Sequence, residues 1–143
     1  MTPTLAPVAE ADFEAMLALR IEALRESLER LGRFDPEVAR ARLKSQFRPA
    51  WMQHLVVVDG ERVGYFTVEP REGALRLHHL YLKPAVQGQG IGAWVIAHIK
   101  AQGQPITLAA LRESRANGFY LRHGFKVVEE QDFDIEYRWE PAA

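Results

Sequence analysis

Three alternating glycines, Gly88, Gly90 and Gly92, lie in the second half of the chain. A glycine has no side chain to keep a ligand off the backbone, and it adopts positive φ readily, so successive N–H groups can point into one small space. An apolar strand and Pro84 precede them, and a predicted helix follows, whose first turn adds unpaired N–H groups and a positive dipole end. The pattern predicts a site for a phosphorylated ligand.

Two common phosphate-binding motifs can be compared with this loop. A P-loop needs lysine and then serine or threonine after its last glycine, whereas Ala93 and Trp94 follow here, which excludes it. Residues 88–93 do fit the dinucleotide-binding pattern G-x-G-x-x-A, and Glu113 stands at roughly the distance expected of a ribose-binding acid. However, a dinucleotide-binding domain would begin at this strand, and here helices and a hairpin precede it.

The N-terminal part of the chain predicts a strand and two helices. A short strand is expected over residues 5–8, and a long amphipathic helix over residues 9–31, where apolar residues recur at helical spacing. Asp35 is a typical N-cap, followed by proline at the first helical position, so a second helix should begin here and end before Pro49.

The chain then changes to the period of a sheet. Strands are predicted over residues 54–58 and 62–68, on either side of an Asp-Gly dipeptide at 59–60 that strongly favours a hairpin. A second turn over residues 70–73 leads into a strand over residues 75–82. These three strands should form an antiparallel meander.

The C-terminal part should complete one mixed sheet. The predicted elements are a helix from residue 91 to near 103, a strand over 105–111, a helix over 114–123, and strands over 125–128 and 132–139. The order strand, helix, strand implies one parallel pair. The sum is about six or seven strands with four helices, an α+β or α/β fold.

Composition excludes several classes of protein. The 143 residues suit one domain, and a net charge of −1 with a pI near 6.5 does not suit a nucleic-acid binder. The absence of cysteine excludes disulfides, thiolate zinc sites and a cysteine nucleophile, and the histidines show no metal-ligand spacing, so no metal is expected. No segment approaches the roughly 20 apolar residues of a membrane span, so we expect a soluble cytoplasmic protein without membrane contact.

Two motifs match those of a known family. After the strand and Pro84, the run 87–92 reads Gln-Gly-Gln-Gly-Ile-Gly, which fits the signature (Arg/Gln)-x-x-Gly-x-(Gly/Ala). Downstream, Ala116 lies four residues before Tyr120, and a Gly-Phe pair follows at 124–125. In these motifs and in the order of its elements, nearly the whole chain resembles the GNAT superfamily of acyl-CoA-dependent N-acyltransferases.

The resemblance implies a fold and a domain organisation. The fold would be α+β (α/β), with a mixed, mostly antiparallel six- to seven-stranded sheet flanked by about four helices in a three-layer sandwich. Residues 1–143 would form a single N-acetyltransferase domain.

The resemblance also implies a binding site for acetyl-CoA. Backbone N–H groups would hold its pyrophosphate, and the edge of the strand before the loop would pair with its pantetheine arm. The implied cofactor-binding residues are Leu80, Tyr81, Leu82, Gln87, Gly88, Gln89, Gly90, Ile91 and Gly92. Glu113 stands where the family often has an asparagine that contacts the cofactor, so this one contact is not carried over.

The resemblance implies one catalytic residue directly, the acid that protonates the thiolate, and leaves the base less well defined. Tyr120 matches a tyrosine that in many members protonates the departing thiolate, and a phenol suits this because its ordinary pKa is about 10. Many relatives carry a glutamate base on the strand before the loop, and this chain has histidines there instead. His78 is the predicted base, with His79 and Glu69 as alternatives, and strand alternation should put the two histidines on opposite faces.

The implied activity is transfer of acetyl from acetyl-CoA to a primary amine by direct attack in a ternary complex. The acceptor would be a small-molecule or peptide amine, and its site would be lined by residues such as Arg20, Arg33 and Trp51. The protein would be a monomer or a homodimer. Two alternatives stay open, a catalytically degenerate CoA-binding sensor or interaction module, and a binder of a different nucleotide.

Overall fold

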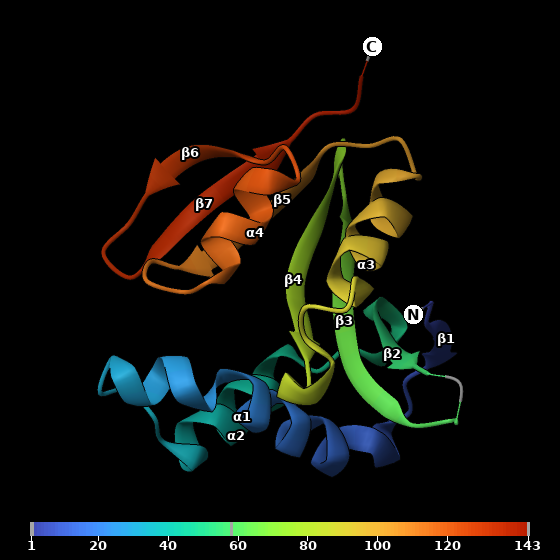
Figure 1. Cartoon of the computed structure of the whole chain (residues 1–143), viewed down its shortest axis with the longest axis vertical. Coiled ribbons are helices and arrows are strands. Elements are labelled where there is room, and N and C mark those ends of the chain that lie inside the picture. The colour runs from blue at the N-terminus through green and yellow to red at the C-terminus, as the bar shows by residue number, and fades with distance from the viewer. Residues whose placement is uncertain (1, 58, 143) are drawn as a thin grey trace. The chain divides into compact units, whose positions relative to one another are not determined.

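The computed structural model describes residues 2–57 and 59–142. In these residues it has one seven-stranded mixed sheet, in the order β1-β2-β3-β4-β5-β7-β6, and four α-helices (Figure 1). The strands are β1 (Thr4–Pro7), β2 (Met52–Val56), β3 (Arg62–Arg71), β4 (Ala74–Leu82), β5 (Ile106–Leu111), β6 (Lys126–Glu130) and β7 (Asp134–Trp139). The helices are α1 (Phe13–Arg30), α2 (Pro36–Gln46), α3 (Ile91–Lys100) and α4 (Ala116–Arg122). The predicted fold class is therefore confirmed.

The chain divides into two compact units. The first contains Met1–Thr67 and His79–Gly92, and the second contains Val68–His78 and Ala93–Ala143. Strands β3 and β4 contribute residues to both units. The first unit thus holds α1, α2 and the glycine loop, and the second holds α4 and the last three strands.

Helices α1 and α2 share the apolar core of the first unit. The core residues are Val8, Met16, Leu17, Leu19, Leu43, Met52 and Tyr65. Helix α2 begins as predicted, because the Asp35 carboxylate accepts the N–H groups of Glu37 at 2.9 Å and Val38 at 3.5 Å. Helix α1 begins later than predicted, since a 3₁₀ turn over Glu10–Asp12 precedes it.

The first hairpin forms where the Asp-Gly dipeptide predicts it. Strands β2 and β3 pair antiparallel, with His54 opposite Tyr65, and Gly60 takes a φ of +79° in the connection. The strand predicted over residues 54–58 instead runs from Met52 to Val56, and Val58 lies outside the described residues. Strand β1 joins the free side of β2, with Leu5 opposite Leu55.

The second turn is shorter than predicted. Strand β3 continues through Pro70 to Arg71, and the turn consists of Glu72 and Gly73. Gly73 has a φ of +73°, so it supplies the left-handed conformation that a two-residue turn needs. The turn therefore lies within the predicted range of residues 70–73 but begins only at Glu72.

In the second unit, β7 lies between β5 and β6. Strand β5 pairs parallel with β4, Leu77 facing Leu108, and antiparallel with β7, Leu108 facing Tyr137. The parallel β4–β5 pair was predicted, whereas the position of β7 was not. The strand predicted over residues 132–139 begins at Asp134, and Phe133, just before it, is 60% exposed.

A helix that crosses a membrane must be both long and apolar. Among residues 2–57 and 59–142, no helix combines the length and the apolar character that such a crossing requires.

Candidate functional site

The glycine loop begins directly after β4, in the first unit. A 3₁₀ turn over Pro84–Val86 leads into it, and α3 begins at Ile91. Gly88 has a φ of +77° and Gly90 a φ of +87°, which L side chains rarely adopt. A Cβ atom on either residue would have no atom within 4 Å, so these glycines are required by backbone conformation and the space above them is open.

Several backbone donors in this loop are available. In the part of the chain that the structure describes, the N–H groups of Gly88, Gln89 and Gly90 donate to no acceptor. Ile91 and Gly92 form the first turn of α3, where N–H groups have no partner within the helix. The loop can therefore offer neutral donors to an anion, as its sequence predicts.

The two glutamines hold the loop in shape. Gln87 donates its backbone N–H to the Pro84 carbonyl at 3.2 Å and its side-chain amide to the Leu82 carbonyl at 3.0 Å. The Gln89 amide donates to the Ala85 carbonyl at 3.3 Å. The N–H of Gln87 is thus already engaged, and its side chain fixes the loop to the end of β4.

Strands β3 and β4 approach closely beside the loop. A Cβ atom on Gly64 would lie 2.4 Å from the Tyr81 carbonyl oxygen and 2.8 Å from Leu82 Cδ2. Only glycine allows this approach, which sets the position of the Tyr81 and Leu82 backbone. The N–H of Lys83 donates to the Val63 carbonyl at 2.8 Å and fixes the end of β4.

Two of the predicted base candidates are bonded to each other in the second unit. His78 is exposed on β4, and its Nε2 lies 2.8 Å from Glu69 Oε1 on β3. Arg71 donates to the same carboxylate at 3.0 Å. The hydrogen bond from His78, together with that from Arg71, lowers the pKa of Glu69. The carboxylate of Glu69 therefore stays ionised and accepts a hydrogen bond from the N–H at Nε2. Nδ1 is then the basic nitrogen of the neutral His78 ring.

His79, the third candidate, is buried in the first unit. Its Nδ1 lies 2.9 Å from Thr67 Oγ1, and its Nε2 lies 3.0 Å from Gln46 Oε1. The same oxygen accepts a hydrogen bond from Arg20 at 3.0 Å, so it must be the amide carbonyl and His79 must donate through Nε2. Sequence reasoning missed Gln46 and Thr67, because nothing in a local pattern links α2 with β3.

Tyr120 lies on α4 in the second unit and is 8% exposed. Its ring lies 5.6 Å from that of Phe125 and 6.1 Å from that of Tyr137, measured between centroids. Asn117 fixes the same helix, because its side chain donates to the Leu111 carbonyl and accepts from the Tyr137 hydroxyl, both at 2.7 Å. Tyr120 and the glycine loop belong to different units.

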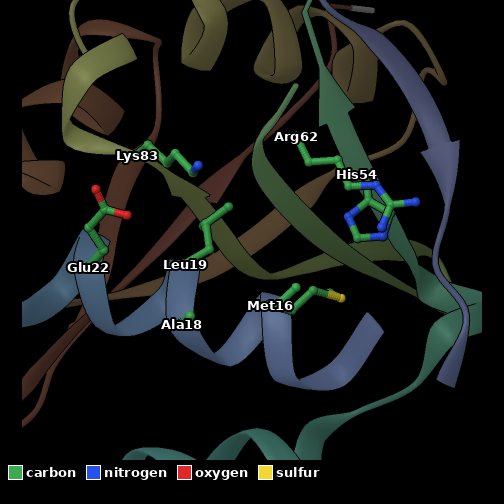
Figure 2. A pocket seen from close by; sticks show the side chains of 8 residues that line it. Met16, Ala18, Leu19, Glu22, His54, Arg62 and Lys83 are labelled. Carbon is green, nitrogen blue, oxygen red and sulfur yellow. The ribbon is translucent and has the colours of Figure 1, made fainter. Parts of the chain in front are cut away.

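A cavity of about 280 Å³ lies against α1 in the first unit. Figure 2 shows Met16 and Leu19 on α1, with His54 and Arg62 at one end and Glu22 and Lys83 toward the other. His54 is bound to Asp12, with 3.0 Å between Nε2 and Oδ2. The sequence did not indicate this cavity, since its residues come from separate elements.

The Asp12 carboxylate organises one end of this cavity. It accepts the N–H of Ala9 at 2.9 Å, and His54 and Arg62 bind it as well, Arg62 at 2.9 Å. These three hydrogen bonds, the one from Ala9 first, lower the pKa of Asp12 far below its usual range. Asp12 therefore ties the start of α1 to β2 and β3.

Potential metal ligands occur as pairs in the described residues. Asp12 binds His54, and Glu69 binds His78. No group of three or more histidine, aspartate or glutamate side chains that could hold a metal ion occurs within residues 2–57 and 59–142.

Comparisons with known proteins agree with this geometry. The family model described as an acetyltransferase (GNAT) domain matches residues 51–127, which is more than half of the chain. No curated protein matches the sequence significantly. The PaiA N-acetyltransferase of Thermoplasma acidophilum in complex with coenzyme A is 17% identical with a TM-score of 0.78, over 98% of this chain and 99% of that chain. An acetyltransferase of Thermus thermophilus is 20% identical with a TM-score of 0.74, over 97% of each chain. These two structures share the fold, and the family model, which matches more than half of the chain, shows that the chain belongs to the GNAT family of acetyltransferases.

Proposed function

We propose that this GNAT-family chain transfers an acetyl group from acetyl-CoA to a primary amine. One observation supports this above all: open backbone N–H groups at Gly88, Gln89 and Gly90 lie just before the first turn of α3. Such neutral, preorganised donors suit a pyrophosphate. The chain has no cysteine to carry an acyl group, which favours direct attack by the amine in a ternary complex.

The proposed cofactor site lies within the first unit. Its residues are Leu80, Tyr81, Leu82, Gln87, Gly88, Gln89, Gly90, Ile91 and Gly92. The N–H groups from Gly88 onward would bind the phosphates, and Gln87 would act through its hold on the Leu82 carbonyl. The backbone of β4 from Leu80 to its end would pair with the amides of the pantetheine arm, as an added strand does.

Two side chains are proposed to move protons. Bound acetyl-CoA supplies the activated thioester. His78 would take the proton of the incoming amine through Nδ1, because Glu69 holds the proton on Nε2. Tyr120 would donate a proton to the departing thiolate. Glu69 is then a positioning residue for His78.

One observation favours a second candidate function. His78 stands on the strand where many family members carry an acid, and a histidine there departs from the usual base. A chain of this kind could bind coenzyme A as a sensor or interaction module without turnover. Measurable acetyl transfer to any amine would exclude this alternative.

We also propose that residues 1–143 act as one N-acetyltransferase domain, because the family match includes parts of both compact units. The expected setting is the cytoplasm, with a small-molecule or peptide amine as acceptor. The protein is expected to be a monomer or a homodimer, and sedimentation velocity would distinguish the two.

Titration calorimetry with acetyl-CoA, coenzyme A and NAD tests the donor side. We expect both coenzyme A compounds to bind and NAD to bind far more weakly, because the loop is proposed to hold a coenzyme A pyrophosphate next to a strand edge that accepts pantetheine. Equal or tighter binding of NAD would contradict the proposed donor and favour a different nucleotide.

A further inference from the structure

Arg20 on α1 is a buried cation that lacks an acidic partner. It is 7% exposed, and it makes one hydrogen bond, from Nη1 to the neutral Gln46 amide at 3.0 Å. Its guanidinium also stacks on Tyr81, 5.4 Å from the ring centroid. In residues 2–57 and 59–142 no aspartate or glutamate pairs with it. Buried arginines are usually paired, because an uncompensated buried charge is costly.

Two nitrogen atoms of Arg20 have no hydrogen-bond acceptor within the described residues. Its Nε and Nη2 atoms make no hydrogen bond in the described part of the chain. Among described side chains, the one polar atom that is both sealed from solvent and without a hydrogen-bond partner is the Tyr65 hydroxyl oxygen. Nε and Nη2 are therefore not completely sealed, and they present two parallel N–H groups of a guanidinium that is held by Gln46 and Tyr81.

Tyr65 adds an unsatisfied hydroxyl beside this arginine. Burial raises the pKa of Tyr65, and both the charge and the N–H groups of Arg20 act against that rise, so the two side chains lie close together. Burial also raises the pKa of Tyr81, and both Arg20 and Arg42 of α2 act against it. Two guanidinium groups therefore contribute positive potential around the Tyr81 phenol, all within the first unit.

We propose that Arg20 binds a carboxylate of the acceptor, so that the acceptor is an amino acid or another amine that carries a carboxylate. This inference rests on the proposed transfer of acetyl to an amine. A carboxylate matches the missing charge and is planar, with two oxygens that fit the paired N–H groups of a guanidinium.

The position suits an acceptor site. Tyr81, on which Arg20 stacks, belongs to the part of β4 whose backbone is proposed to hold the pantetheine arm. An acceptor anchored at Arg20 therefore lies alongside that strand. Polyamines are disfavoured, because a second ammonium group near Arg20 and Arg42 adds repulsion instead of removing it.

Matched acceptor pairs test this proposal. Each of the common amino acids is compared with its decarboxylated amine, for example L-leucine with 3-methylbutylamine and L-phenylalanine with 2-phenylethylamine, by initial rates of thiol release. We expect kcat/KM to be about tenfold or more higher for the carboxylate-bearing member of each reactive pair. Arg20→Gln should bring the ratio close to one and leave the KM for acetyl-CoA unchanged. Arg25→Gln, an exposed arginine on the same helix, should keep the wild-type ratio.

Tyr65→Phe provides a second control. It removes only a sealed hydroxyl beside Arg20, so the protein should stay folded and the preference for carboxylates should persist. Equal rates for both members of the pairs, or a preference that persists in Arg20→Gln, would overturn the proposal. If no amine is acetylated, ligand-observed NMR with the same pairs decides: amino-acid binding that disappears in Arg20→Gln and persists in Tyr65→Phe supports the anion site, and no binding, or binding that persists in Arg20→Gln, overturns it. Calorimetry with acetyl-CoA reports separately on the proposed transfer.

Discussion

The hydroxyl of Tyr120 is the proposed proton donor to the departing thiolate. Replacing it in Tyr120→Phe should lower kcat by about a hundredfold, because a positioned general acid typically contributes a factor of this size or larger. The KM for acetyl-CoA should change by less than about twofold, since the glycine loop is untouched. Steady-state kinetics with varied acetyl-CoA measures both quantities.

Tyr137→Phe is the matched control for that variant. The Tyr137 hydroxyl donates to Asn117 of α4 at 2.7 Å, so its loss should lower the free energy of unfolding by about 1 kcal/mol. We expect kcat to stay near the wild-type value in this control. Wild-type turnover in Tyr120→Phe, or an equal loss in both variants, would remove the proposed role of Tyr120.

Asp12 should make the stability of the protein depend on acid pH. Its pKa is lowered in the folded state, so its contribution is fully present above the unfolded pKa of about 3.9 and is lost as pH falls below that value. Asp12→Asn should therefore be less stable than wild type by about 2 kcal/mol at pH 7. The difference should shrink between about pH 4 and pH 2. Urea unfolding at several pH values measures it, and a difference independent of pH would contradict this account.

Single residues were predictable where their role follows from local sequence. The Asp35 cap and the positive φ of Gly88 and Gly90 depend on neighbours in the chain, and the structure agrees with both. His79 differs, because its partners Gln46 and Thr67 come from α2 and β3. One sequence cannot show such long-range hydrogen bonds, and the same reason hid the unpaired charge of Arg20.

At the scale of elements, the loop between β4 and α3 is the central feature. Gly90→Val places a β-branched residue at a φ of +87° and puts a side chain into the open space above the loop. We expect coenzyme A to bind about tenfold more weakly or worse, which corresponds to the loss of one strong hydrogen bond. Calorimetry measures this change.

Gly73→Val separates strain from binding. Gly73 has a φ of +73° in the β3–β4 turn, and a Cβ atom there, as on Gly90, would have no atom within 4 Å. Both variants should lose stability by about 1–3 kcal/mol, but only Gly90→Val should lose coenzyme A affinity. Unchanged affinity in Gly90→Val would show that the anion does not bind over this loop.

The existence and type of each helix and strand were predicted better than the residues at which it begins and ends. Every predicted helix and strand has a counterpart, because hydrophobic period and turn residues act locally. The turn predicted over residues 70–73 begins only at Glu72, since Glu72 and Gly73 suffice to reverse the chain there. The 3₁₀ turn before α1 and the shift of β2 toward its N-terminus reflect packing and pairing that act beyond a local window.

At the scale of the whole molecule, the sequence predicted the class of fold but not the arrangement of all strands. The parallel pair of β4 and β5 followed from the order strand, helix, strand. The position of β7 between β5 and β6 did not, because several sheet orders bury the same apolar residues. The division into two units places the glycine loop in one and Tyr120 in the other, which no local pattern indicates.

The central claim is acetyl transfer from acetyl-CoA to an amine. Its most direct test is to incubate the wild-type chain with acetyl-CoA carrying a ¹³C-labelled acetyl group and a panel of amines, and to follow free thiol and labelled amide together by mass spectrometry. We predict that one or more amines gain one labelled acetyl group for each thiol released. Binding of acetyl-CoA without any labelled amide, or thiol release that does not depend on an amine, would contradict the claim.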